Sequence, residues 1–126
     1  ESYGAAFGIT NLGKLRLTLR NWPTNITLDS SSALTPGIWT HVAGTQGPSG
    51  LALYINGTQV ASNSTNYPWT TGIDGISVGA NQFGDSGMQG ILGGSFEYFG
   101  GLIDDLHIYN RTLSGPEIKT VYNATK

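Results

Sequence analysis

The chain has 126 residues and a net charge of −2, and only 11% of its residues are charged. This length is enough for one domain with a buried core, and the lack of a basic surplus argues against nucleic acid as a partner. No apolar run reaches the roughly 18 residues of a membrane span, so we expect none. The chain contains no cysteine, which excludes disulfides, zinc–thiolate sites and cysteine nucleophiles.

The first part of the chain predicts two strands. Residues Lys14–Arg20 alternate strictly, with Leu15, Leu17 and Leu19 on one face and charged residues or threonine on the other. This pattern is typical of a strand with one face in the core and the other in solvent. The segment before it, Tyr3–Thr10, is rich in small residues and is predicted to be a neighbouring strand.

The middle of the chain predicts a strand followed by a hairpin. The strand covers Ile38–Gln46, and the hairpin joins Leu51–Ile55 to Gln59–Ser62. Its turn is Asn56-Gly57, and Asn-Gly favours a type I′ turn because both central residues need a positive φ.

The last third predicts more strands around a long loop. Ile73–Ala80 is expected to be a strand, and Ser95–Tyr109 is expected to contain the last one or two. Between them, Asn81–Gly94 is a glycine-rich loop of a length that is uncommon without a functional reason.

One short helix is expected over Pro116–Tyr122. Ser114 can cap its first turn, and Glu117 follows three residues later, which fits a capping box. Pro116 suits the first turn, where its missing N–H costs nothing.

Three of these segments together carry a family resemblance: Trp39–Thr45, Leu51–Ser62 and Phe99–Ile118. In sequence, order and spacing they resemble the laminin-G-like domains of the concanavalin A-like lectin and glucanase group. The resemblance implies an all-β fold over residues 1–126, namely a single antiparallel β-sandwich of the jelly-roll type with one short C-terminal helix. That fold serves binding modules, adhesive domains, structural domains and a few enzymes, so it does not by itself choose a function.

By this resemblance the chain matches the later part of the family's domain, because the strands that usually precede Ser2–Arg20 are absent. A sandwich without those strands exposes unpaired sheet edges. Three explanations stay open. The chain is part of a longer polypeptide, as its start at Glu1 rather than Met also indicates. A copy or partner supplies the strands by β-addition, which builds an oligomer or fibre. Or the domain is a minimal sandwich.

The sequence contains five N-glycosylation sequons, more than its composition leads us to expect by chance. If they carry glycans, the protein is a secreted glycoprotein. The alternative is a surface that is merely rich in asparagine and threonine, and at one sequon the Asn-Gly turn already explains the residues. The acceptor positions are Asn25, Asn56, Asn63, Asn110 and Asn123.

One carboxylate is a candidate metal ligand. On a strand, Asp104 would share a face with Leu106 and Ile108, and a carboxylate beside apolar side chains needs a partner. Related domains often bind calcium, so the resemblance implies that Asp104 with Asn81 or Asp85 supplies oxygen ligands. The alternative is that Asp104 accepts hydrogen bonds from the backbone of an adjoining loop.

Aromatic side chains in predicted loops are candidates for sugar binding, because an aromatic face stacks on a sugar ring. Each of them also has a plainer interpretation as a lid on the edge of the sandwich. The candidates are Trp22, Tyr67, Trp69 and Phe83, with Tyr67–Trp69 the best segment because Pro68 stiffens it. In contrast, we expect Trp39, Tyr54 and Tyr109 to lie in the core, and His41 and His107 to be packed or hydrogen-bonded residues of strands rather than a metal pair.

No catalytic residue is proposed. The Glu-x-Asp-x-Glu strand of glycosidases with this fold is absent, so an enzyme is not expected. The sequence favours a non-catalytic, extracellular structural or adhesive domain that assembles with copies of itself or a partner through open sheet edges. The alternative is a carbohydrate-binding module, with calcium as an optional cofactor, in a larger secreted or surface protein.

Overall fold

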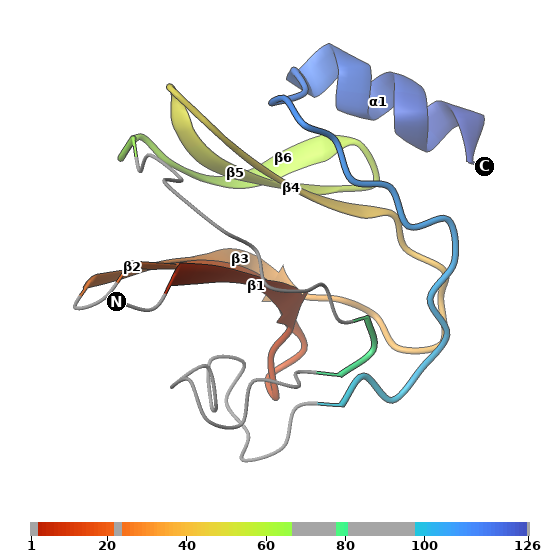
Figure 1. The fold of residues 1–126 in the computed structure, drawn as a ribbon. Coiled ribbons are helices and arrows are strands. Elements are labelled where there is room, and N and C mark those ends of the chain that lie inside the picture. Colours follow the sequence, from red (N-terminus) through yellow and green to blue (C-terminus); the bar gives the residue numbers. More distant parts are fainter. Residues whose placement is uncertain (1–2, 22–23, 67–77, 81–97, 126) are drawn as a thin grey trace.

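Two antiparallel sheets lie face to face, and one helix covers the outside of the second (Figure 1). This computed structural model describes residues 3–21, 24–66, 78–80 and 98–125. Each sheet consists of strands that are consecutive in the sequence. The first contains β1 (Tyr3–Ile9), β2 (Lys14–Asn21) and β3 (Thr24–Ala33); the second contains β4 (Val42–Gly47), β5 (Gly50–Ile55) and β6 (Thr58–Asn63); the helix is α1 (Gly115–Ala124).

Leucines from the central strand of each sheet form the core between the sheets. In β2 the alternating leucines all point inward, as predicted, and they meet Leu51 and Leu53 of β5. The register sets Leu17 opposite Phe7 of β1 on one side and opposite Leu28 of β3 on the other. The alternation of β2 therefore decides which face of the whole first sheet is buried.

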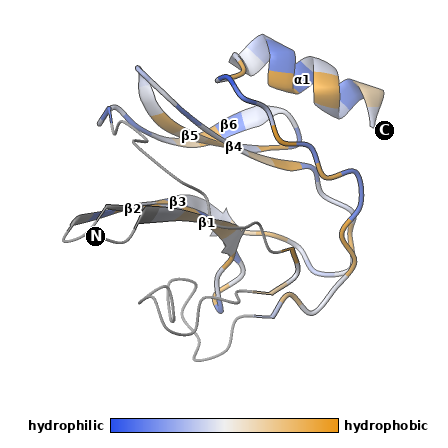
Figure 2. Cartoon of the chain, viewed as in Figure 1, coloured by the Kyte–Doolittle hydropathy of each residue, from blue (hydrophilic) through white to orange (hydrophobic). Residues whose placement is uncertain are grey.

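The outer face of β5 is buried as well, because α1 packs on it. Ile118 of the helix forms a second apolar cluster with Ala52 and Tyr54, which point away from the leucine core. The apolar residues Ile118, Val121 and Ala124 recur about once per turn of α1, with polar residues between them, as in an amphipathic helix (Figure 2). The predicted capping box is present: the Ser114 hydroxyl accepts a hydrogen bond from the Glu117 N–H, and the Glu117 carboxylate accepts one from the Ser114 N–H.

The predicted Asn-Gly turn joins β5 to β6, with φ of 50° at Asn56 and 74° at Gly57. A Cβ at Gly57 would lie 2.7 Å from Cδ of the flexible Lys119 side chain and 3.2 Å from the Lys119 Cα, so the helix leaves little room for a side chain there. The Asn56 N–H donates to the His41 carbonyl, and the His41 N–H donates to the Asn56 side-chain oxygen. The turn therefore connects the hairpin, the start of β4 and the helix.

Strand β3 was not predicted from the sequence. Its sequence is mostly polar, and cross-strand pairs with β2 stabilise it. Arg16 and Asp29 form an ion pair of 2.6 Å, and the hydroxyls of Thr18 and Thr27 lie 3.1 Å apart. Thr18 is 2% exposed, so the expectation of a fully solvated outer face on β2 is wrong at that position.

Two other strand predictions need correction. The strand expected from Ile38 begins only at Val42, and Trp39 is 66% exposed instead of lying in the core. Of the segment Ser95–Tyr109, the described residues 98–109 contain one isolated bridge, between Ala80 and Tyr98, and no ladder. Tyr109 is accordingly exposed, whereas Tyr54 is buried as predicted. Most of the strand Ile73–Ala80 and the whole loop Asn81–Gly94 lie outside the described residues.

Replacing Leu53 by alanine should lower the free energy of unfolding by about 2–5 kcal/mol, because Leu53 is fully buried between the sheets and its loss leaves a cavity. Urea denaturation followed by tryptophan fluorescence measures the change. The control is Leu12→Ala, since Leu12 is 72% exposed, and it should change stability by less than about 0.5 kcal/mol. Equal losses in the two variants would show that the core is placed wrongly.

Candidate functional site

Residues 98–112 form a segment that we call the strap. It runs along one side of the molecule from the level of the first sheet to the start of α1 (Figure 1). Its first end is held by the Phe99 N–H, which donates to the Gly79 carbonyl at 2.8 Å. Its last end is held by the Thr112 hydroxyl, which donates to the Gln46 carbonyl at the end of β4. The strap is thus fixed at its last end to the end of β4, and its first end is bonded to residues 78–80.

Between these ends the strap has no strand partner. Across the described residues, no backbone hydrogen bond joins residues 100–111 to another segment. The bonds made in this stretch are local, such as the 3.3 Å contact between His107 Nδ1 and the Tyr109 hydroxyl. The backbone N–H and C=O groups of the strap are therefore unpaired, like those of an edge strand, and could pair with a further strand.

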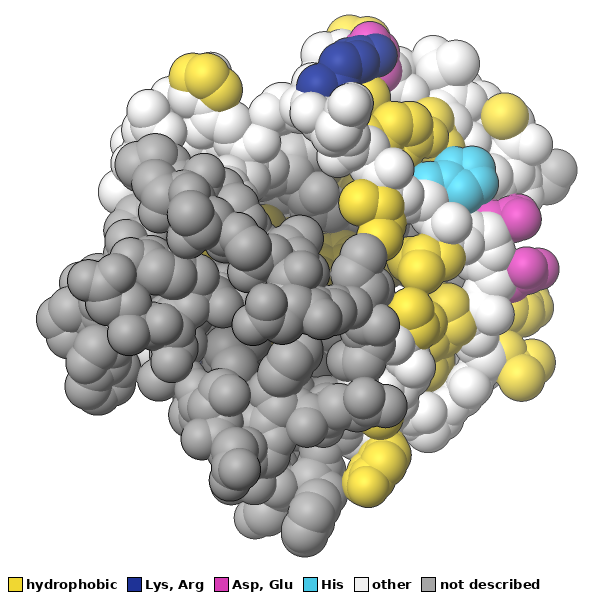
Figure 3. All heavy atoms as spheres, in the orientation of Figure 1, with side chains coloured by type: hydrophobic (Ala, Val, Ile, Leu, Met, Phe, Trp, Pro, Cys, Tyr) yellow, Lys and Arg dark blue, Asp and Glu magenta, His cyan; other side chains and the backbone are white. Residues whose placement is uncertain are grey.

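The strap also exposes apolar side chains. Leu102 is 78% exposed and Leu106 is 57% exposed. Figure 3 shows apolar side chains that follow one another along one side of the molecule, beside a histidine and two acidic residues, and orange apolar stretches recur along the strap in Figure 2. Apolar side chains that gather on a surface in this way mark an interaction site more often than a free surface. The others in the strap are Tyr98, Phe99, Ile103, Ile108 and Tyr109.

Asp105 explains why the predicted face of this segment is wrong. Its φ is 50°, in the left-handed region, which aspartate tolerates better than most residues. The Asp105 N–H donates to the Asp104 carboxylate at 2.9 Å. The chain turns at this residue, so Asp104 does not share a strand face with Leu106 and Ile108, and all three are exposed.

His41 lies where the strap, β4 and α1 come together. Its ring centroid is 5.7 Å from that of Tyr122, and its Nδ1 is buried without a hydrogen-bond partner. Burial of the ring, and then the charge of His107, hold the pKa of His41 below its ordinary value of 6.5. Neither histidine lies in a strand, which corrects that part of the prediction, but His41 is packed and His107 is hydrogen-bonded as expected.

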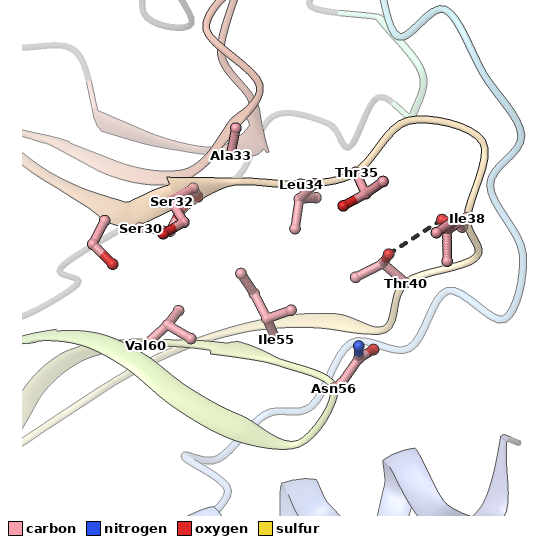
Figure 4. A pocket seen from close by; sticks show the side chains of 11 residues that line it. Ser30, Ser32, Ala33, Leu34, Thr35, Ile38, Thr40, Ile55, Asn56 and Val60 are labelled. Carbon is pink, nitrogen blue, oxygen red and sulfur yellow. Dashed lines mark hydrogen bonds between the residues drawn. The ribbon is translucent and has the colours of Figure 1, made fainter.

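A pocket of about 340 Å³ opens between the end of β3 and the β5–β6 hairpin (Figure 4). Ile55 and Val60 form its apolar side, and serine and threonine hydroxyls form the other. Several of these hydroxyls are already used: Thr40 donates to the Ile38 carbonyl, and Ser30 donates to the Ser32 carbonyl. None of the lining residues is charged, so the pocket has no group that would select a charged ligand.

Two described carboxylates have structural partners. Asp29 is paired with Arg16, whose hydrogen bond lowers the pKa of the Asp29 carboxyl. Glu117 lies 2.8 Å from Arg111, which together with the Ser114 N–H lowers the pKa of Glu117 to about 2. Both carboxylates are therefore held ionised, and a general acid needs the opposite shift.

Of the predicted metal-binding and sugar-binding residues, Asp104 is the one that lies within the described ranges. Asp104 is exposed on the strap, whereas Asn81 and Asp85 lie outside the described residues, and no group of three or more His, Asp or Glu side chains suited to a metal occurs within the described ranges. Calcium stays a prediction. So do the sugar-binding aromatics, because Trp22, Tyr67, Trp69 and Phe83 all lie outside the described part of the chain.

Most of the sequon asparagines are exposed, so a glycosylating enzyme could reach them. Asn25, Asn56, Asn110 and Asn123 are exposed, and Asn63 is half-buried. Two of these side chains already make a hydrogen bond through the oxygen: that of Asn56 accepts from the His41 N–H, and that of Asn63 accepts from the Thr65 N–H. The amide nitrogen, to which a glycan attaches, is the other atom in each case, so glycosylation remains a prediction at all five positions.

A laminin G-like model of the concanavalin A-like lectin/glucanases superfamily matches residues 2–119, so the chain belongs to this superfamily. Its fold is the mostly-β jelly-roll sandwich that the sequence motifs predicted, with one C-terminal helix. No protein of curated function matches the chain.

One solved structure is similar over most of the chain. It is the crystal structure of residues 221–444 of an S-layer domain-containing protein from Clostridium thermocellum. The two sequences are 36% identical, the TM-score is 0.59, and the match covers 87% of this chain and 52% of the other. The chain therefore spans about half the length of that crystallised chain.

The strap was missed as a site because its residues look like those of a core strand. Leu102, Ile103 and Ile108 are the side chains that a buried strand would carry. A local pattern does not say whether a neighbouring strand exists.

The pH dependence of stability should reveal the buried His41. The unfolded chain takes up a proton at this position as the pH falls through 6.5, whereas the folded chain takes it up only at lower pH. The free energy of unfolding should therefore decrease as the pH falls below 6.5. His41→Phe keeps a ring against Tyr122 and should make this decrease shallower in urea titrations between neutral and mildly acidic pH.

The matched control is Leu12→Ala, because Leu12 is 72% exposed and carries no titratable group, so this variant should keep the wild-type slope. If His41→Phe and the wild-type chain lose stability with the same slope, His41 does not titrate differently in the folded state.

Proposed function

We propose that this chain is a non-catalytic, extracellular structural or adhesive domain that assembles with copies of itself or with a partner protein. The observation that supports this proposal most is the strap, with its unpaired backbone and exposed apolar side chains. Laminin G-like domains are generally binding or structural modules, which agrees with a non-catalytic function.

The edges of the sheets support the same proposal. Within the described residues, β1 pairs only with β2, and β4 pairs only with β5. Phe7 of β1 points inward against Gly44 of β4, yet it is 44% exposed. The core is thus open on the side where β1 and β4 face each other. An added strand there would cover Phe7 and satisfy the edge backbone, which is the mode of recognition by β-addition.

A surface location is supported by two observations. The similar crystal structure comes from an S-layer domain-containing protein. Four of the five sequon asparagines are exposed, as glycan attachment in a secreted protein requires. The helix among the described residues is too short and too polar to cross a membrane. Repeated strand exchange between copies at such a surface would build a fibre, because a head-to-tail contact does not close on itself.

The native molar mass tests assembly directly. Size-exclusion chromatography with light scattering on the natively produced chain should give a multiple of the glycosylated mass, which itself exceeds the 13.3 kDa of the polypeptide. The proportion of the assembled form should rise with protein concentration. A single chain plus glycans at every concentration would contradict assembly with copies of itself, and pull-down of a strand-donating partner would then be the remaining form of the proposal.

The alternative function is a carbohydrate-binding module, with calcium as an optional cofactor. Membership of a lectin superfamily favours it, and so does Asp104, whose carboxylate is exposed and forms no ion pair within the described residues. A glycan array measured with and without a chelator tests it. Specific binding that Trp69→Ala abolishes, at unchanged molar mass, would favour the module. No binding to any glycan, with assembly retained, would favour the structural function.

A further inference from the structure

The middle of the strap is complementary to itself. In an antiparallel strand pair related by a two-fold axis, the residue on the axis faces its own copy, and residues equally far from it on either side face each other. With Leu106 on the axis, Asp105 faces His107, and Ile103 faces Tyr109. One face of such a pair would carry two carboxylate–imidazole pairs and two aliphatic–aromatic pairs, and the other would have Leu106 against Leu106 at its centre.

Other registers of the same segment are worse. An axis at Asp104 or at Asp105 sets two like carboxylates directly opposite each other, which destabilises a strand pair. An axis at His107 sets two imidazoles opposite each other and leaves Ile103 facing Arg111, which is bonded to Glu117. An axis at Ile108 sets His107 against Tyr109 and Asp105 against Arg111, but Arg111 is already bonded to Glu117. The register centred on Leu106 pairs Asp105 with His107 and Ile103 with Tyr109 without using a cation that is already bonded, and it leaves Asp104 opposite Ile108.

We propose that the strap pairs antiparallel with the strap of a second copy of this chain, centred on Leu106, and so forms a two-fold symmetric dimer. This inference rests on the proposed function and names its partner and contact. The strap is suited to it because, among the described residues, no other segment bonds to the backbone of residues 100–111, and the apolar side chains of this stretch are exposed. Such a contact closes at two copies, so any larger assembly would use the sheet edges in addition.

Pairing requires one change within the strap. Asp105 has to leave the left-handed region and become extended, so that its carboxylate reaches His107 of the second copy. Within the part of the chain that the structure describes, the bond that opposes this change at Asp105 is the local one from its N–H to the Asp104 carboxylate. The two ends of the strap stay fixed at Gly79 and Gln46, which holds the segment in place for a partner.

A single cysteine tests the register, and the chain has no cysteine of its own. Leu106→Cys places the new thiol opposite its own copy, where paired Cα atoms lie about 4.5–5.5 Å apart, within reach of a disulfide. Mild oxidation should give a covalent dimer that a reductant reverses. Leu102→Cys is the matched control, because Leu102 is at least as exposed but its two copies would lie about 27 Å apart.

A charge swap tests the cross-strand pairs. Asp105→His sets imidazole against imidazole and should weaken the dimer about three- to tenfold, as measured by analytical ultracentrifugation. The double variant Asp105→His/His107→Asp restores the pairs and should regain the affinity. The control is Asp104→His, which makes the same change one residue away, opposite the apolar Ile108, and should not be rescued by His107→Asp.

The molar mass of Leu106→Lys separates failure of this inference from failure of the proposed function. If the wild-type chain and Leu12→Lys assemble but Leu106→Lys does not, the strap is the contact. If all three assemble equally, or if Leu106→Cys does not cross-link, this inference is overturned while the proposed function stands, with the sheet edges as the contact. A wild-type chain that is monomeric at every concentration overturns both forms of self-assembly.

Discussion

The structure depends on the burial of β5 on both of its faces. Leu51 and Leu53 point into the core between the sheets, and Ala52 and Tyr54 point outward under α1. The second sheet is therefore the middle layer of three, and the helix is a part of the core rather than an appendage. With its faces covered in this way, the middle layer has only its edges left for other contacts. The surfaces left for a partner are therefore the edges of the sheets and the strap.

In the strap, local preference and tertiary structure disagree. Its residues favour a strand, but no described neighbour provides a ladder, so the segment is extended, bent at Asp105 and exposed. Natural sequences tend to keep such disagreements for functional sites. The same constraint connects both proposals, because an unpaired backbone and exposed apolar side chains are satisfied together only by another strand.

The sequence predicted the elements whose signal is local. The leucine alternation of β2, the Asn-Gly turn and the capping box each work through a few neighbouring residues, and all three are present. Strand β3 was not predicted, because its stability comes from pairs with β2, such as Arg16 with Asp29. A local sequence pattern carries no information about such cross-strand pairs. The strap was predicted as a strand for the opposite reason, since its pattern is right and its partner is missing. For the candidate site, the family motif Phe99–Ile118 already singled out the segment that contains most of the strap. It did not predict that the apolar side chains of the strap are exposed, because their exposure depends on which segments lie beside it.

The order of the strands has a consequence for how the molecule folds. Each sheet is built from three successive strands, so nearly all of its ladder joins residues that are close in the sequence. Contacts of this kind form quickly, because little chain entropy is lost in closing short loops. The bond from Thr112 to Gln46 spans 66 residues, and the packing of Ile118 on β5 spans a comparable distance. We therefore expect two hairpin-built sheets to form first and the helix to dock afterwards, with the strap drawn along the side of the sandwich as the last connection to be made.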